Sequence, residues 1–242
     1  MLTLRNHPFA VETTFEASIV LTYAVAKEEL EKLIPACLQL DTFDNQWGFV
    51  ALALVSSKKL RPKGFPEFMG DDFILAGYRI FVRYTNPKGK IFRGLYILKS
   101  ETNKPKMSFF GNIFTHYNYT TTDIGFQKIN NLTHIISQKS GIDIQVEQSE
   151  KAMLPLDSPF TDWKEARKFA GPLPFTFTCN EERREILIIE GVRQNWTPKP
   201  LSILSAKIGF LERLNFKTIV PANAFVIENI PYYWKKGRLE KW

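Results

Sequence analysis

The feature that most constrains the fold is a series of short apolar segments separated by turns, and it is clearest in the middle of the chain. Residues 75–84 and 90–99 are rich in β-branched and aromatic residues, and Asn86-Pro-Lys-Gly89 lies between them. Proline presets one backbone dihedral of a turn and glycine accepts a positive φ. This pattern therefore predicts a β-hairpin.

Similar segments along the chain predict further strands at residues 15–25, 38–43, 47–55, 175–178, 184–190, 203–210 and 225–230. Residues 126–136 and 142–146 fit either strands or a helix followed by a strand. Residues 26–34 and 161–169 have the spacing of short helices, the second ended by Gly171-Pro172. Many short strands with few helices predict a β-rich α+β fold with a closed or strongly curved sheet.

No internal repeat and no long Pro/Gly/Ser-rich linker divides the sequence. A length of 242 residues is common for one β-rich domain, so we expect a single domain over residues 1–242. The aromatic content of 14% favours strands and could supply flat surfaces that line a cavity.

The chain carries a formal net charge of +7, which favours an anionic partner. Residues 56–70 combine several lysines and arginines with proline and glycine, so they are predicted to form a basic surface loop. This loop and the tail 234–238 could bind a polyanion, but an ordinary solvated surface is the more common explanation, and we do not expect nucleic acid. Exposed aromatics such as Trp234 and Trp242 could instead form an assembly surface, and the oligomeric state stays open.

Cys37 and Cys179 stand far apart, without Cys-x-x-Cys spacing, so the sequence indicates neither a disulfide framework nor a zinc site. We expect them to be free thiols. The N-terminal residues lack the apolar core of a signal peptide, and the longest apolar stretch, residues 47–55, is too short to span a bilayer. These observations predict a cytoplasmic protein that does not enter a membrane.

Three segments together carry a resemblance to a known family. They are residues 30–44, with the sequence Leu-Asp-Thr-Phe-Asp at the end; residues 78–82 with the arm 94–98; and residues 165–177 with the run 190–198. In these segments the chain resembles the YqjF-like family of uncharacterised bacterial proteins, whose members have the acetoacetate decarboxylase-like fold. The resemblance implies a cone-like β-barrel with an internal cavity and a few short helices. It implies no activity.

Decarboxylases with this fold use two adjacent lysines, one of which forms a Schiff base after its neighbour lowers its pKa. The resemblance places Asn118 and Tyr119 where those lysines would stand. Neither side chain can form an imine. The adjacent pairs Lys58-Lys59 and Lys235-Lys236 lie in the predicted loop and in the tail, so we do not expect adjacent-lysine decarboxylation.

Two residues are candidates for a catalytic role. Lys99 ends an apolar strand and shares its parity with Arg93 and Ile97, so it could be a desolvated amine inside a barrel; the alternative is a solvated strand end, which is more common. His116 lies among Phe114, Tyr117 and Tyr119, where it could transfer a proton or simply form part of an aromatic cluster.

Four residues are candidates for binding a ligand: Arg79, Tyr117, Arg193 and Trp196. Arg79 lies among apolar residues of a predicted strand, so it requires a carboxylate of the protein, such as Glu190 or Asp41, or one of a ligand. Arg193 and Trp196 lie in a Gly-Val-Arg-Gln-Asn-Trp run, which could hold an anion or anchor a loop.

Cofactor and metal chemistry lack their usual signals in this sequence. His7, His116 and His134 show no recognised metal spacing, and there is no G-x-G-x-x-G, Walker or G-x-S-x-G motif. We expect no cofactor and no metal. The sequence thus favours a protein that binds a small organic, possibly anionic, molecule in a barrel cavity, and it leaves open whether the protein is an enzyme.

Overall fold

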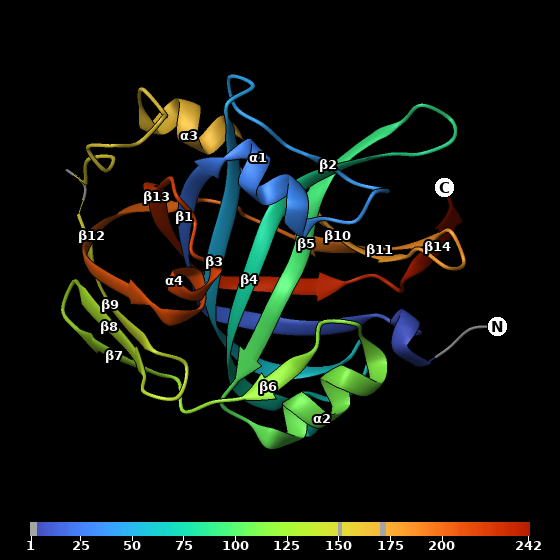
Figure 1. Cartoon of the computed structure of the whole chain (residues 1–242). Helices are drawn as coiled ribbons and strands as arrows, with labels where there is room; N and C mark the ends of the chain where they lie inside the picture. The colour runs from blue at the N-terminus through green and yellow to red at the C-terminus, as the bar shows by residue number, and fades with distance from the viewer. Residues whose placement is uncertain (1–3, 150–151, 170–172) are drawn as a thin grey trace.

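The computed structural model describes residues 4–149, 152–169 and 173–242 (Figure 1). Its strands are β1 (Val11–Ala26), β2 (Gln39–Leu40), β3 (Trp47–Pro62), β4 (Asp71–Thr85), β5 (Ile91–Thr102), β6 (Tyr119–Thr121), β7 (Gly125–Ile129), β8 (Leu132–Ser137), β9 (Ile142–Gln148), β10 (Phe175–Asn180), β11 (Glu185–Arg193), β12 (Lys199–Ile208), β13 (Ile219–Trp234) and β14 (Arg238–Lys241). The α-helices are α1 (Lys27–Leu30), α2 (Pro105–Phe114), α3 (Trp163–Phe169) and α4 (Gly209–Leu214), and the 3-10 helices are η1 (Leu4–Asn6), η2 (Glu31–Leu33) and η3 (Glu67–Met69). The expectation of a β-rich chain with few helices is confirmed.

The central strands pair in a path that returns to its start. The order is β11-β10-β5-β4-β3-β1-β13, and β13 also pairs with β11. All of these pairings are antiparallel except the one between β10 and β5, which is parallel. Strands β12, β9, β8 and β7 continue from β13 as an antiparallel extension. The central strands therefore form a ring with an inner and an outer face.

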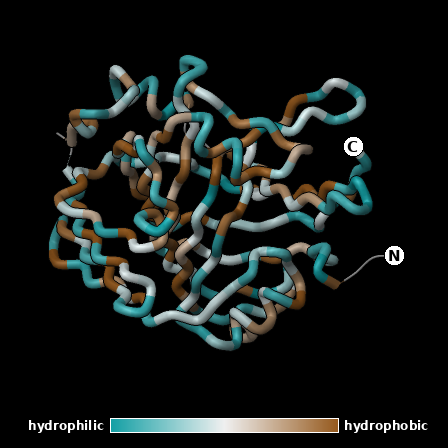
Figure 2. The backbone as a smooth tube through the Cα atoms, in the orientation of Figure 1, coloured by the Kyte–Doolittle hydropathy of each residue, from teal (hydrophilic) through white to brown (hydrophobic). Residues whose placement is uncertain are grey.

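The outer face of the ring holds the main hydrophobic core. Leu52 and Leu54 of β3 and Ile80 of β4 pack with Ile135 of β8 and Ile144 of β9 in one fully buried cluster. Because apolar residues cover both faces of β3, this strand is a nearly continuous apolar run rather than an alternating one. Figure 2 shows hydrophobic residues along the central strands and hydrophilic residues in the peripheral loops.

Two smaller apolar clusters lie on the inner face. One contains Phe49, Phe81 and Phe160 together with residues of α3. The other contains Val55 and Leu75, and Met107 of α2 packs against it. Since α2 and α3 lie at opposite ends of the central strands (Figure 1), the two clusters fill the two ends of the ring.

The hairpin predicted around Asn86 is present, with β4 and β5 in antiparallel register. The predicted loop at residues 56–70 is wrong in its first half, because β3 continues to Pro62. Lys58, Lys59 and Arg61 are held there by ion pairs to acidic neighbours. Residues 126–136 form two strands, and the expected end of α3 at Gly171-Pro172 lies outside the described residues.

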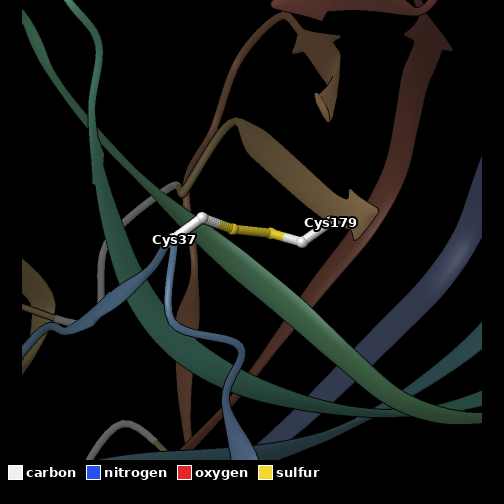
Figure 3. Close-up of a disulfide and its surroundings, with 2 residues drawn as sticks. All are labelled: Cys37 and Cys179. Carbon is white, nitrogen blue, oxygen red and sulfur yellow. A yellow bond between two sulfur atoms is a disulfide. The ribbon is translucent and has the colours of Figure 1, made fainter. Parts of the chain in front are cut away.

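The two cysteines are joined, which corrects the expectation of free thiols. The sulfur atoms of Cys37 and Cys179 form a disulfide between the segment after η2 and the end of β10 (Figure 3). A sequence separation of 142 residues leaves no local pattern from which the pair could be recognised. Within the part of the chain that the structure describes, no helix is long and apolar enough to cross a membrane.

Candidate functional site

A cavity of about 120 Å³ lies on the inner face of the ring, between its two apolar ends. Strands β1, β3, β4, β5, β10, β11 and β13 all contribute to its wall, because their alternate residues face inward. Most of the lining is apolar and includes Val20, Ala53, Val55, Phe81, Leu95 and Ile97. The cavity is thus a mostly apolar space into which a few polar groups project.

The charged groups of this cavity are two guanidinium groups. Arg79 extends from the middle of β4, and Arg193 extends from the end of β11. Burial is the main cause that lowers the pKa of each group, and neighbouring tyrosines such as Tyr232 oppose that shift. Each side chain would be stabilised by an anion in the cavity, because an anion favours the charged form.

Three hydrogen-bond donors at the cavity lack partners. They are Nε of Arg79, Nη2 of Arg193 and Nε1 of Trp196, which are buried and form no hydrogen bond within the described part of the chain. Buried polar groups in native proteins are nearly always paired. Unpaired donors on residues that line one cavity indicate a missing acceptor.

The protein's own carboxylates are engaged elsewhere. Asp41 binds Arg93, with Nη2–Oδ2 at 2.6 Å, and it also contacts Arg83 at 3.5 Å. Glu190 pairs with Lys235 at 2.9 Å. Neither of the acidic residues expected from the sequence is the partner of Arg79, and among the described residues no acidic side chain lines the cavity.

Arg193 is held in place by an aromatic ring. Its guanidinium carbon lies 4.0 Å from the ring centre of Trp196, and Trp196 meets Phe225 edge to face at 6.2 Å. Stacking fixes the plane of an arginine and leaves its edge free to form hydrogen bonds. The loop between β11 and β12 thus supplies the ring of Trp196 against which the guanidinium of Arg193 lies at the cavity wall.

Hydroxyl groups complete the polar part of the wall. The phenol oxygen of Tyr117 lies 2.7 Å from Oγ1 of Thr176 on β10. Burial raises the pKa of Tyr117 to about 12, and burial also raises the pKa values of Tyr119 and Tyr232. At neutral pH these phenols keep their protons, so they can donate hydrogen bonds to an acceptor.

Lys99 does not line this cavity. A bulge between Tyr78 and Arg79 shifts the register of β4 and β5, so Arg79 lies opposite Ile97 whereas Lys99 lies opposite Tyr78 on the other face. There the ammonium group of Lys99 lies 2.6 Å from Oε1 of the buried Glu101. The parity of Lys99 with Ile97, which the sequence suggested, is wrong for this reason.

His116 lies in a different hollow. Its Nε2 atom is 3.2 Å from Oδ1 of Asn6, and the surrounding wall includes Cys179 and Arg183. Burial and the positive charge of Arg5 lower its pKa. The structure brings together Arg79, Tyr117, Arg193 and Trp196, and it separates both candidate catalytic residues from them.

Thr176 and Tyr232 also belong to the cavity and were not among the sequence candidates. Tyr232 is paired with Arg193 across β13 and β11. Strand parity could have placed Tyr232 and Trp234 on one face, but no local signal connects β13 with β11. Of Asn118 and Tyr119, the two residues that the family resemblance places at the lysine positions of the decarboxylases, Tyr119 lines the cavity. No lysine lines the cavity within the described residues.

The ring of strands matches a known architecture. An acetoacetate decarboxylase from Legionella pneumophila has a TM-score of 0.64 at 11% identity, covering 96% of this chain and 88% of that one. An acetoacetate decarboxylase-like enzyme from Sphingomonas wittichii has a TM-score of 0.59 at 10% identity, covering 98% and 95%. The enduracididine biosynthesis enzyme MppR, in complex with pyruvate, has a TM-score of 0.56 at 10% identity, covering 99% and 91%. At such identities the likeness establishes the acetoacetate decarboxylase-like fold.

The family follows from the sequence match. The model of the family DUF2071, which is described as an uncharacterised conserved protein, matches residues 12–228 of the chain. The chain belongs to this family. Among curated proteins none matches it.

Proposed function

We propose that this protein binds a small organic acid, as its carboxylate, in the cavity of the strand ring. The observation that carries the proposal is the set of unpaired donors of Arg79, Arg193 and Trp196, three residues that line the same cavity. An arginine is costly to bury without a counter-charge, and its planar group matches the two oxygens of a carboxylate. A bound carboxylate would supply the acceptors that these groups lack.

The proposal takes the ring of strands to be a cone-like barrel and its cavity to be the binding site. Small-molecule sites are typically concave and mostly apolar, with a few well-placed polar groups. The cavity fits this description, because its apolar wall would contact the body of the ligand while Tyr117 and Thr176 would contact its polar atoms. MppR, which shares the fold, was solved with pyruvate, a small carboxylate.

The proposed binding is non-covalent. A Schiff base requires a lysine near the substrate carbonyl. Lys99 is paired with Glu101 on the other face of β5, and Asn118 and Tyr119 occupy the positions that resemble the decarboxylase lysines. The site would therefore hold its ligand by ion pairs and hydrogen bonds. The basic surface offers weaker support for a polyanion partner, since Lys58, Lys59 and Arg61 are paired with acidic neighbours.

Calorimetric titration with propionate and with its neutral analogue propionamide tests the proposal. We expect propionate to bind and propionamide not to bind. Because charge-assisted hydrogen bonds contribute about 1.5–3 kcal/mol each, Arg79→Gln should weaken propionate binding by about tenfold or more. Arg83→Gln removes an arginine from the same strand outside the cavity and is the control. Equal binding of the acid and the amide, or equal losses in both variants, would contradict the proposal.

A further inference from the structure

A second cavity, of about 130 Å³, lies beside the first and shares part of its wall. It is bounded by Trp163, Ala166 and Arg167 of α3 and by residues near the junction of β12 and β13. Trp196 and Phe225 line both cavities. Only aromatic side chains are therefore common to the two walls, and a molecule that reached from the guanidinium groups into the second cavity would have to pass beside these rings.

The second cavity has a polar end of its own. Asn223 lines it and is 1% exposed, and the Oδ1 atom of Asn223 has no hydrogen-bond partner within the described residues. Asn223 and Phe225 are two positions apart on β13 and so project to the same face. Thr22 of β1 lies directly opposite Asn223, and its buried Oγ1 atom also lacks a partner in that part of the chain.

Two unpaired groups at one place are unusual in a protein interior. An unsatisfied buried amide or hydroxyl costs free energy, and most such groups are paired with protein or water. Asn223 lines the second cavity, and Thr22 lies opposite it on β1, so a ligand in this cavity would lie beside the amide group of Asn223. The polar end calls for a group that can donate a hydrogen bond to the amide oxygen of Asn223.

We propose that the ligand is an aryl carboxylic acid with a distal hydroxyl group, and that it occupies both cavities. This inference rests on the proposed function, because it places the carboxylate at Arg79 and Arg193. The aryl ring packs against Trp196 and Phe225, and the distal hydroxyl donates to Oδ1 of Asn223. The ligand class is thus a phenolic acid rather than a short acid of the size of pyruvate.

A series of three acids tests the inference by calorimetry: acetate, phenylacetate and 4-hydroxyphenylacetate. Burying an aryl ring is strongly favourable, so phenylacetate should bind about 30-fold more tightly than acetate. The hydrogen bond to Asn223 should make 4-hydroxyphenylacetate about fivefold tighter than phenylacetate. Asn223→Leu keeps the approximate size of the side chain and should remove the difference between the two aryl acids.

A second variant tests the same inference independently in case Asn223→Leu does not fold. Ala166→Leu adds bulk from α3 into the second cavity, and it should weaken phenylacetate much more than acetate. Thermal denaturation establishes that each variant is folded before titration. An unchanged ratio between phenylacetate and acetate in a folded Ala166→Leu variant counts against the second cavity.

The outcomes separate the inference from the proposed function. If all three acids bind equally well and Arg79→Gln abolishes their binding, the carboxylate site stands and the two-cavity inference is wrong. If none of the acids binds, both are overturned. A 4-hydroxyphenylacetate preference that persists in Asn223→Leu overturns the role of Asn223 in recognising the hydroxyl.

Discussion

Gly191 and Tyr232 are in such close contact that any side chain at position 191 would have to displace the phenol of Tyr232. A Cβ atom on Gly191 would lie 1.8 Å from the phenol oxygen of Tyr232, far inside the contact distance. The pairing of β11 with β13 brings these residues together at the cavity wall. The missing side chain of Gly191 is what allows the phenol of Tyr232 to lie beside Arg193.

Gly191→Ala should therefore displace Tyr232 and disturb the charged end of the cavity. We expect the free energy of unfolding to fall by about 1–3 kcal/mol, as for other overpacked positions, and propionate binding to weaken. Chemical denaturation and calorimetry measure the two effects. Gly125→Ala is the matched control, because a Cβ atom there meets nothing within 4 Å. Equal behaviour of the two variants would contradict this account.

Arg79 should lower the stability of the ligand-free protein. Its guanidinium has an unpaired buried Nε atom, and replacing a buried charge with an apolar side chain of similar length is often stabilising. Arg79→Met should raise the free energy of unfolding by about 1–3 kcal/mol without ligand and abolish carboxylate binding. Arg83→Met is the control and should have the opposite effect: it removes a partner of the buried Asp41, so the free energy of unfolding should fall. Loss of stability in both variants would show that Arg79 is satisfied by the protein itself.

The sequence was sufficient to predict most of the longer strands and the shared parity of Arg79 and Phe81, because both depend on local pattern. Arg79 has the same parity as Phe81, and both line the cavity. The same parity argument failed for Lys99, two strand positions after Ile97, because a single bulge reverses the face. Nothing in the residues around Lys99 indicated where the register would shift.

Contacts between distant segments were the other part that the sequence could not supply. The pairing of Tyr232 with Arg193 closes the ring between strands that are not neighbours in the chain. The second cavity forms because α3 lies beside β13. No pattern in the sequence around Asn223 indicates that its amide oxygen is buried without a partner. The family resemblance provided the fold, but only the assembled ring shows which polar groups lack partners.

The disulfide between Cys37 and Cys179 should contribute to stability. Joining residues with a sequence separation of 142 restricts the unfolded chain, and removal of a native disulfide typically costs about 2–5 kcal/mol. Cys179→Ser should lose stability by this amount in urea denaturation. Dithiothreitol should lower the stability of the wild-type protein by a similar amount, because it reduces the disulfide. It should leave the stability of a variant with both cysteines replaced unchanged. Alkylation of two thiols in the native, unreduced protein would contradict the pairing.

His7 should make stability depend on pH. Its ring is 6% exposed, its Nδ1 atom has no partner among the described residues, and burial lowers its pKa. Because the folded pKa lies below the unfolded value of about 6.5, the unfolded chain takes up the proton first, and stability decreases as pH falls through this value. The backbone of His7 has a φ of 51°, a conformation that asparagine tolerates well, so His7→Asn is the suitable variant. Urea denaturation at pH 5, 6 and 7 should show a shallower loss of stability in His7→Asn than in the wild type. The comparison concerns the slopes, since losing the buried ring lowers the stability of the variant at every pH. Parallel slopes would mean that His7 is protonated in the folded protein as readily as in the unfolded chain.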